Sequence, residues 1–252
     1  MKKIITTLGI ATLLPMSSFG TTILFGGTFF ADAFSADGTA LEVGPSLGSL
    51  TGEVNFQLGV FATVDNTGAV MEATPTSGNV NQFTQLFLSI GSSAFNSDLI
   101  TLDDDVTQLP ANNFGAGIEF DNTSVIQEFD GTVSSVTAES IADFQLYILG
   151  YDASPDDFDS GAAEILLVTG NGFVVPDAAA PGVGNDNFPV VVDINSADTA
   201  IIGRIDGGNG GGITLGNPTL TDDGFQFAVV PEPSTSLLLI LSSLVLMRRV
   251  RP

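Results

Sequence analysis

The sequence predicts an all-β protein, an antiparallel β-sandwich of jelly-roll type with one short helix. Short apolar runs recur throughout residues 21–230 and are separated by Gly, Asn, Asp and Pro, which terminate strands and form turns. Within residues 54–60, apolar side chains alternate with polar or small ones, the period of a half-buried strand. Hydrophobic residues make up 44% of the chain and include 19 Phe, enough for a packed core in a chain without cysteine.

The beginning of the chain has the pattern of a secretory signal peptide. Lys2 and Lys3 precede the apolar residues 4–15, and the small residues Ser18 and Gly20 follow where a signal peptidase prefers them. The apolar stretch is too short for a membrane anchor. We therefore expect signal peptidase to cleave after Gly20 and the rest of the chain to be exported by the secretory route.

The apolar runs predict the strands, and the dipeptides between them predict the turns. Asp or Asn followed by Gly or Asn favours a tight turn, because these residues tolerate left-handed backbone conformations. Such dipeptides occur at 121–122, 130–131, 171–172, 206–207 and 223–224. Strands are expected at 22–30, 54–60, 99–102, 117–120, 124–129, 144–149, 164–169, 172–175, 190–194, 200–205, 213–215 and 225–230.

One segment departs from the strand pattern. In residues 80–90 the apolar side chains recur at intervals of three and four positions, namely Phe83, Leu86, Phe87 and Ile90. This spacing places them on one face of a helix. The sequence therefore predicts one short amphipathic helix over residues 80–90.

A single β domain, residues 21–229, is expected between the two ends of the chain. Residues 176–189 are rich in Ala, Gly and Pro, typical of a long surface loop, and the glycine run 206–212 suits a hairpin tip. Neither stretch separates regions of different composition. The predicted organisation is a signal peptide over 1–20, the β domain, and a C-terminal segment over 230–252.

The C-terminal segment has three physically different parts. It begins with the run Val230-Pro231-Glu232-Pro233-Ser234-Thr235, whose prolines lack an N–H donor and cannot enter a helix interior or a sheet ladder. Residues 234–247 form an apolar helix of about 20 Å, short against a hydrocarbon core of about 30 Å. The arginines that follow favour the cytoplasmic side and reach the lipid headgroups, which compensates for a short span. A buried core helix or a permanent membrane anchor is the alternative interpretation.

This order of parts resembles the sorting tail of PEP-CTERM proteins, a family of exported bacterial proteins. The resemblance implies export, retention in the membrane through a transmembrane helix over 234–247, and processing by an exosortase, a membrane-embedded enzyme. It assigns the sorting motif to Pro231, Glu232, Pro233, Ser234 and Thr235, and the topology to Arg248, Arg249 and Arg251. Residues 144–151, 163–168 and 172–176 also resemble, loosely, a strand trio of small, uncharacterised exported β proteins with such tails, which implies a shared β-sandwich scaffold.

The charge of the middle of the chain is strongly negative. Of the 29 acidic residues all but Glu232 lie within residues 21–230, where Arg204 is the only base, so 28 acids face one base and the formal charge is near −27. Such a domain repels nucleic acid and anionic lipid, and salt or divalent cations should favour its fold. We expect Arg204 to form a structural ion pair with nearby carboxylates.

The residue inventory excludes several catalytic chemistries. The chain has no His and no Cys, and no Lys follows Lys3, which excludes a Ser-His-Asp triad, a thiol nucleophile, a Ser-Lys dyad and histidine-ligated metal. Calcium, which prefers oxygen ligands, is the cofactor to consider. Its candidate ligands are Asp103, Asp105, Asp157 and Asp159. The alternative is that these acidic clusters are solvated loops.

The sequence therefore predicts a non-enzymatic protein of the cell surface or extracellular matrix, tethered to the membrane until an exosortase processes it. The first alternative is an extracellular polysaccharide-binding module, with or without the assistance of calcium. The second is a carboxylate-based glycan hydrolase, which needs only two suitably spaced acids.

Overall fold

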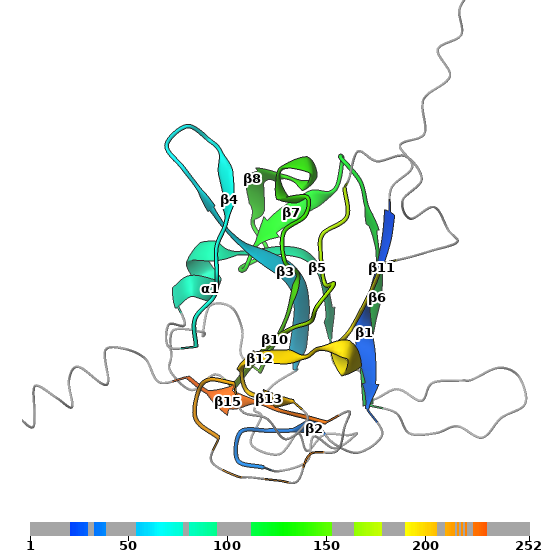
Figure 1. Cartoon of the computed structure of the whole chain (residues 1–252), viewed down its shortest axis with the longest axis vertical. Coiled ribbons are helices and arrows are strands. Elements are labelled where there is room, and N and C mark those ends of the chain that lie inside the picture. The colour runs from blue at the N-terminus through cyan, green and yellow to red at the C-terminus, as the bar shows by residue number, and fades with distance from the viewer. Residues whose placement is uncertain are drawn as a thin grey trace, which may run out of the picture.

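The structure is a computed structural model, and it describes residues 21–29, 33–38, 54–77, 81–94, 112–152, 164–177, 190–205, 210–214, 216, 218, 220 and 224–230. These residues are mostly strands, and most strand pairs are antiparallel (Figure 1), which confirms the all-β, antiparallel prediction. Two pairs, β1 with β11 and β14 with β2, are parallel. The strands are β1 Thr21–Phe29, β2 Ala33–Phe34, β3 Asn55–Val64, β4 Val70–Glu72, β5 Phe87–Ala94, β6 Asn112–Phe120, β7 Val125–Glu128, β8 Val133–Thr137, β9 Tyr147–Tyr151, β10 Glu164–Thr169, β11 Val190–Asp193, β12 Thr199–Ile202, β13 Arg204–Ile205, β14 Phe225–Gln226 and β15 Ala228–Val229.

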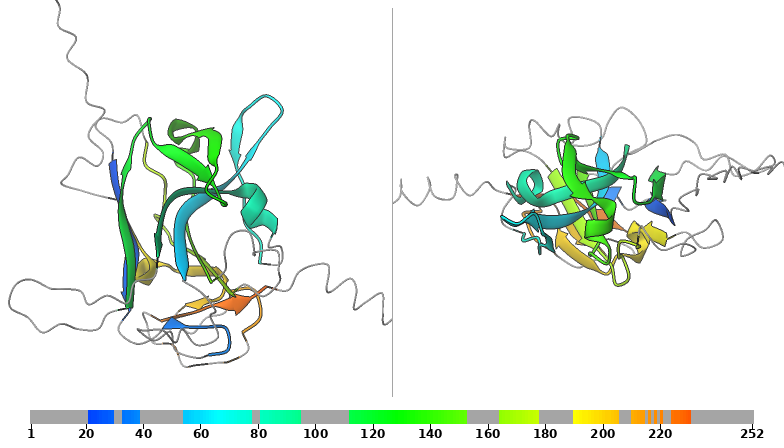
Figure 2. Two further views of the ribbon diagram at one scale, coloured as in Figure 1. Left: turned by 180° about the vertical axis from the view of Figure 1, so that it is seen from behind. Right: turned by 90° about the horizontal axis from the view of Figure 1, so that it is seen from above.

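The described strands form three sheets. The largest has nine strands in the order β12-β10-β9-β3-β5-β7-β8, with β15 paired to β10 and β4 paired to β3. The second has the order β11-β1-β6, and the third has the order β13-β14-β2. Figure 2 shows the second sheet facing the largest one, with the third at one end of both. The described helical segments are α1 Asn81–Leu86 and the 3₁₀ turns η1 Ala138–Ile141 and η3 Ile194–Ser196.

Most predicted strands coincide with observed ones, and the differences have local causes. The predicted strand 200–205 divides into β12 and β13 at Gly203, which has a φ of 85°. The predicted strands 172–175 and 213–215 contribute only single bridges, through Val174 and Ile213. The segment 99–102 lies outside the described residues. The sequence interpretation missed β2, β4, β5 and β8.

The prediction of a helix over residues 80–90 is wrong beyond Leu86. The helix α1 ends there, and the chain continues directly into the strand β5. Phe83 of α1 and Phe87 of β5 nevertheless both pack against Phe61, with centroid distances of 5.9 and 5.2 Å. However, β5 is paired with β3 on one side and β7 on the other, and these inter-strand hydrogen bonds outweigh a weak local helical preference.

The central strands of the nine-stranded sheet, β3, β9 and β10, are buried on both faces. On one face, Phe56, Leu58 and Val60 of β3 belong to a core that includes Ile23 and Phe25 of β1. On the other face, Phe61 of β3 belongs to a second core with rings from α1, β5 and β9. Because strand side chains alternate between faces, a single strand supplies both cores.

Glycines mark places where neighbouring strands approach closely. A Cβ on Gly91 of β5 would lie 2.2 Å from Ile118 Cδ1 of β6, so the Ile118 side chain occupies the space that a side chain at position 91 would need. A Cβ on Gly59 would lie 2.2 Å from the Leu88 carbonyl oxygen and 2.6 Å from Phe87 Cζ. Gly59 also sits at a register shift between β3 and β5, which is typical of a β-bulge.

We predict that Gly59→Ala lowers the free energy of unfolding by about 1–3 kcal/mol, the usual cost of overpacking a core. The matched control is Gly117→Ala on β6, where the added Cβ would lie 3.4 Å from Leu24 Cδ2, an ordinary contact. That variant should stay within about 0.5 kcal/mol of the parent protein. Urea unfolding of both variants measures the difference, and equal stabilities would refute the close approach at Gly59.

Candidate functional site

The sorting motif predicted from the sequence begins where the described structure stops. Pro231, Glu232, Pro233, Ser234 and Thr235, together with Arg248, Arg249 and Arg251, lie outside the described residues. The last described residue, Val230, is buried, with 2% of its surface exposed. None of the described helices is long and apolar enough to cross a bilayer.

The predicted calcium ligands are likewise not placed. Asp103, Asp105, Asp157 and Asp159 all lie outside the described residues. Within the described ranges, no three acidic side chains gather in an arrangement that suits a metal ion. The calcium prediction therefore remains a prediction.

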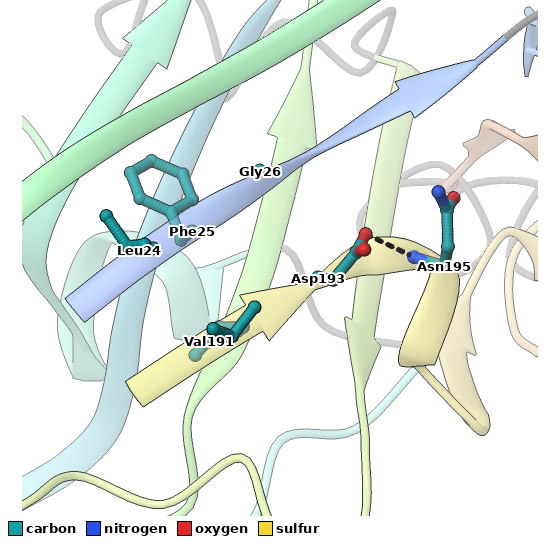
Figure 3. A pocket seen from close by; sticks show the side chains of 7 residues that line it. Leu24, Phe25, Gly26, Val191, Asp193 and Asn195 are labelled. Carbon is teal, nitrogen blue, oxygen red and sulfur yellow. Dashed lines mark hydrogen bonds between the residues drawn. The ribbon is translucent and has the colours of Figure 1, made fainter. Parts of the chain in front are cut away.

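A groove of about 260 Å³ lies between β1 and β11 (Figure 3). The two strands are parallel neighbours in which Leu24 is opposite Val191, and both side chains are largely exposed, at 41% and 59%. Figure 3 shows these two apolar side chains near one end and Asp193 and Asn195 near the other. The full lining is Leu24, Phe25, Gly26, Val191, Val192, Asp193 and Asn195.

The polar end of the groove is built by the start of η3. Asp193 ends β11 and caps η3, because its Oδ1 accepts a hydrogen bond of 3.0 Å from the Asn195 backbone N–H. This bond fixes the carboxylate beside the apolar platform of Leu24 and Val191. Such an arrangement suits binding of a molecule with hydroxyl donors and an apolar face, since a carboxylate accepts several hydrogen bonds.

The sequence interpretation did not identify this groove. The signal was present: an Asp and an Asn two residues apart directly follow a run of three valines. What could not be predicted is that β11 pairs in parallel with β1, about 165 residues earlier in the chain, because such long-range pairing leaves no local pattern.

Two carboxylates, Asp152 and Glu164, are buried side by side near β15. Asp152 Oδ1 accepts from the Glu164 backbone N–H at 2.7 Å, and Glu164 Oε2 accepts from the Ala36 backbone N–H at 2.7 Å. Burial raises the pKa of Asp152 above its usual value; the negative charge of Glu164 adds to this rise, and the hydrogen bond from the Glu164 N–H opposes it. Because both carboxylates bind the protein's own backbone, we assign them a structural role.

Arg204 is also buried, in the third sheet. Its Nη1 donates to Gln226 Oε1 at 2.7 Å, and Gln226 Nε2 in turn donates to the carbonyl oxygens of Ser35, Ala36 and Gly216 at 3.1–3.2 Å. Gln226 therefore joins β13, β14 and the segment after β2. The predicted ion pair of Arg204 with a carboxylate stays a prediction.

A further buried amide lies on the second face of the large sheet. Gln57 Nε2 donates to Tyr151 Oη at 2.7 Å and to the Phe129 carbonyl oxygen at 3.3 Å. The rings of Phe129 and Tyr151 pack edge to face, with centroids 5.2 Å apart. Burial raises the pKa of the Tyr151 hydroxyl, so it stays protonated at neutral pH and contributes a neutral hydrogen bond.

We predict that Asp152→Asn raises the thermal unfolding midpoint of the protein at pH 7. The folded-state pKa of Asp152 is raised, so its stabilising contribution is complete below the unfolded-state pKa and is lost as the pH rises through the folded-state pKa. The neutral Asn still accepts the Glu164 N–H bond and avoids this loss. The gain should therefore shrink as the pH falls toward 4.

Thermal unfolding from pH 4 to pH 7 measures this difference. The control is Asp198→Asn: hydrogen bonds from the Thr199 hydroxyl and the Asn171 N–H lower the pKa of Asp198, so removing its charge should bring no gain at pH 7. An advantage of Asp152→Asn that is the same at pH 4 and pH 7 would contradict the argument from charge.

Comparison with known proteins gives no relative from which a role could be transferred. No protein-family model, curated protein or solved structure matches this chain.

Proposed function

We propose that the chain is an exported, non-enzymatic protein of the cell surface or extracellular matrix, sorted by its C-terminal tail. The observation that carries the proposal is the order of parts after Val230: a Pro-Glu-Pro motif, an apolar segment over 234–247 and a cluster of arginines. This is the order of a PEP-CTERM tail, and an exosortase is the partner that it implies. Signal peptidase is the expected partner at residues 1–20.

We propose further that residues 21–229 form one β-sandwich domain, of jelly-roll type. Supporting this, the β11-β1-β6 sheet shares a core with one face of the nine-stranded sheet, and β5 and β6 approach closely at Gly91 and Ile118. Phe225 and Phe227 pack on Phe56 at one end of this core, with ring centroids 6.3 and 6.2 Å away. Two sheets that share an inner core are the defining feature of a sandwich.

The acidity of the domain agrees with an extracellular destination. Several acidic side chains accept hydrogen bonds from residues that closely follow them in the chain. Asp65 Oδ1, for example, accepts hydrogen bonds of 2.6–2.9 Å from the Thr67 N–H, the Thr67 hydroxyl and the Ala69 N–H. The same Asp-x-Thr turn recurs at Asp121 and Asp130. These bonds lower the pKa of Asp65 and Asp130, so the carboxylates stay charged at neutral pH and keep the surface hydrated.

The second candidate function is binding of an extracellular polysaccharide, with or without calcium. The groove between β1 and β11 favours it, because Leu24 and Val191 offer an apolar platform beside the Asp193 carboxylate. A sugar ring presents both an apolar face and hydroxyl donors to such a site.

We predict that replacing Pro231, Glu232 and Pro233 by Ala prevents processing of the tail. Mass spectrometry of the C-terminal peptide from native cells should find the parent protein in the supernatant, with residues 234–252 absent. The variant should keep an intact Arg251-Pro252 end and stay with the membranes. If the parent protein also keeps that end, and only in membranes, the segment is a permanent anchor and the sorting proposal is wrong.

For the second function, we predict that Val191→Ser weakens retention of the protein on its own cells' exopolysaccharide by several-fold, because it removes the apolar platform. Val133→Ser is the control, since Val133 is an even more exposed valine, at 71% against 59% for Val191, on β8 and far from the groove in sequence. Pull-down with and without chelator measures retention and any calcium requirement. Failure of the parent protein to bind in either condition would remove this candidate.

A further inference from the structure

The sheet holds the chain up to the residue that precedes the sorting motif. Val229 is paired with Glu164 of β10 on one side. On its other side it exchanges two backbone hydrogen bonds with Ile213, of 2.7 and 2.9 Å. Val230 is buried among the second core residues. The fold therefore has no free linker before Pro231.

The connection from this point to the membrane helix is very short. Only residues 231–233 separate Val230 from the proposed helix over 234–247. Even measured to the first leucine of the apolar run, Leu237, the connection has six residues and reaches at most about 20 Å, since a trans chain advances about 3.3–3.6 Å per residue. A domain on such a tether cannot stand away from the bilayer.

Val230, where the chain leaves the sheet, lies at one end of the nine-stranded sheet, which is called the exit end. In the register, Ile165 of β10 is opposite Tyr151 of β9, and Tyr151 is opposite Asn55, the first residue of β3. β3 has ten residues, so its far end is about 33 Å away along the strand. Figure 1 shows the same separation: β15, β13 and β2 lie at one end, and the turn between β3 and β4 lies at the other.

Exposed acids occur at both ends of the described structure. Beside β15, Ile213 is 47% exposed, and the two acids next to that strand, Asp152 and Glu164, are buried. Asp37, in the segment after β2 at the same end, is exposed, as are Asp65 and Glu72 at the far end. Charge therefore does not choose the orientation, and the short connection after Val230 is what places the exit end at the lipid.

We propose that the end of the domain formed by β15 and Ile213 lies on the lipid surface, held there by the short connection to the tail. The inference rests on the proposed function, because it requires the tail to insert into a membrane. It assigns a partner of defined chemistry, the phospholipid headgroups, to one end of the domain. Until the tail is cut, that end is covered by lipid and the β3–β4 end points away from the membrane.

The test uses the protein with its tail, reconstituted in vesicles of phosphatidylethanolamine and phosphatidylglycerol that contain a lipid with a nitroxide on its headgroup. Because the chain has no cysteine, Ile213→Cys and Asn66→Cys each give one labelling site for a fluorophore. Asn66 lies in the turn after β3, at the far end. Thr214→Cys is a second site at the exit end. We expect the nitroxide to quench the labels at 213 and 214 several-fold more than the label at 66.

A variant with a longer connection between the domain and the tail distinguishes the effect of the short connection from any affinity of the domain itself for lipid. Twenty Gly and Ser residues inserted between Val230 and Pro231 add an average reach of about 25 Å. Quenching at position 213 should then fall to the level at position 66, while co-flotation with vesicles stays unchanged. Equal quenching at 213 and 66 without the insert, or quenching that the insert does not alter, overturns the inference. Loss of flotation of the parent protein overturns the proposed function instead.

Discussion

The strand β3 is the constraint on which the rest of the structure depends. It is paired along both edges, with β5 on one side and β9 on the other, and seven consecutive residues from Phe56 to Ala62 are buried. A strand buried on both faces must be covered twice. One cover comes from the β11-β1-β6 sheet, and the other includes Phe83 of α1, whose ring packs on Phe61.

Polar side chains hold the covering segments to this sheet, because an apolar contact alone does not fix a register. Gln226 joins the third sheet to the segment after β2, and Gln57 joins β3 to β9 and to the residue after β7. Gln145 Nε2 donates to Thr169 Oγ1 at 2.7 Å and to the Phe173 carbonyl oxygen at 2.6 Å, which connects the segment before β9 to β10 and the turn that follows. Amides serve well here because one group both donates and accepts without carrying a charge.

The two ends of the described structure are built differently. At one end, residues of β15 are paired on both sides up to the start of the proposed tail. At the other, the turns carry aspartates whose carboxylates are held by threonine hydroxyls and backbone N–H groups. The pairing of β15 does not involve residues after Val230, so the proposed removal of the tail would leave this pairing intact.

The sequence by itself determined the strand-rich class, most strand positions and the turns at Asp121, Asp130 and Asn171, because alternation and turn residues act over a few positions. It also carries the proposed sorting motif, which depends only on consecutive residues. Only the tertiary structure decided that α1 stops at Leu86, because the strand after it is held by pairing to β3 and β7. The same holds for the groove at Leu24 and Val191 and for the burial of Val230, which require segments far apart in the chain to meet.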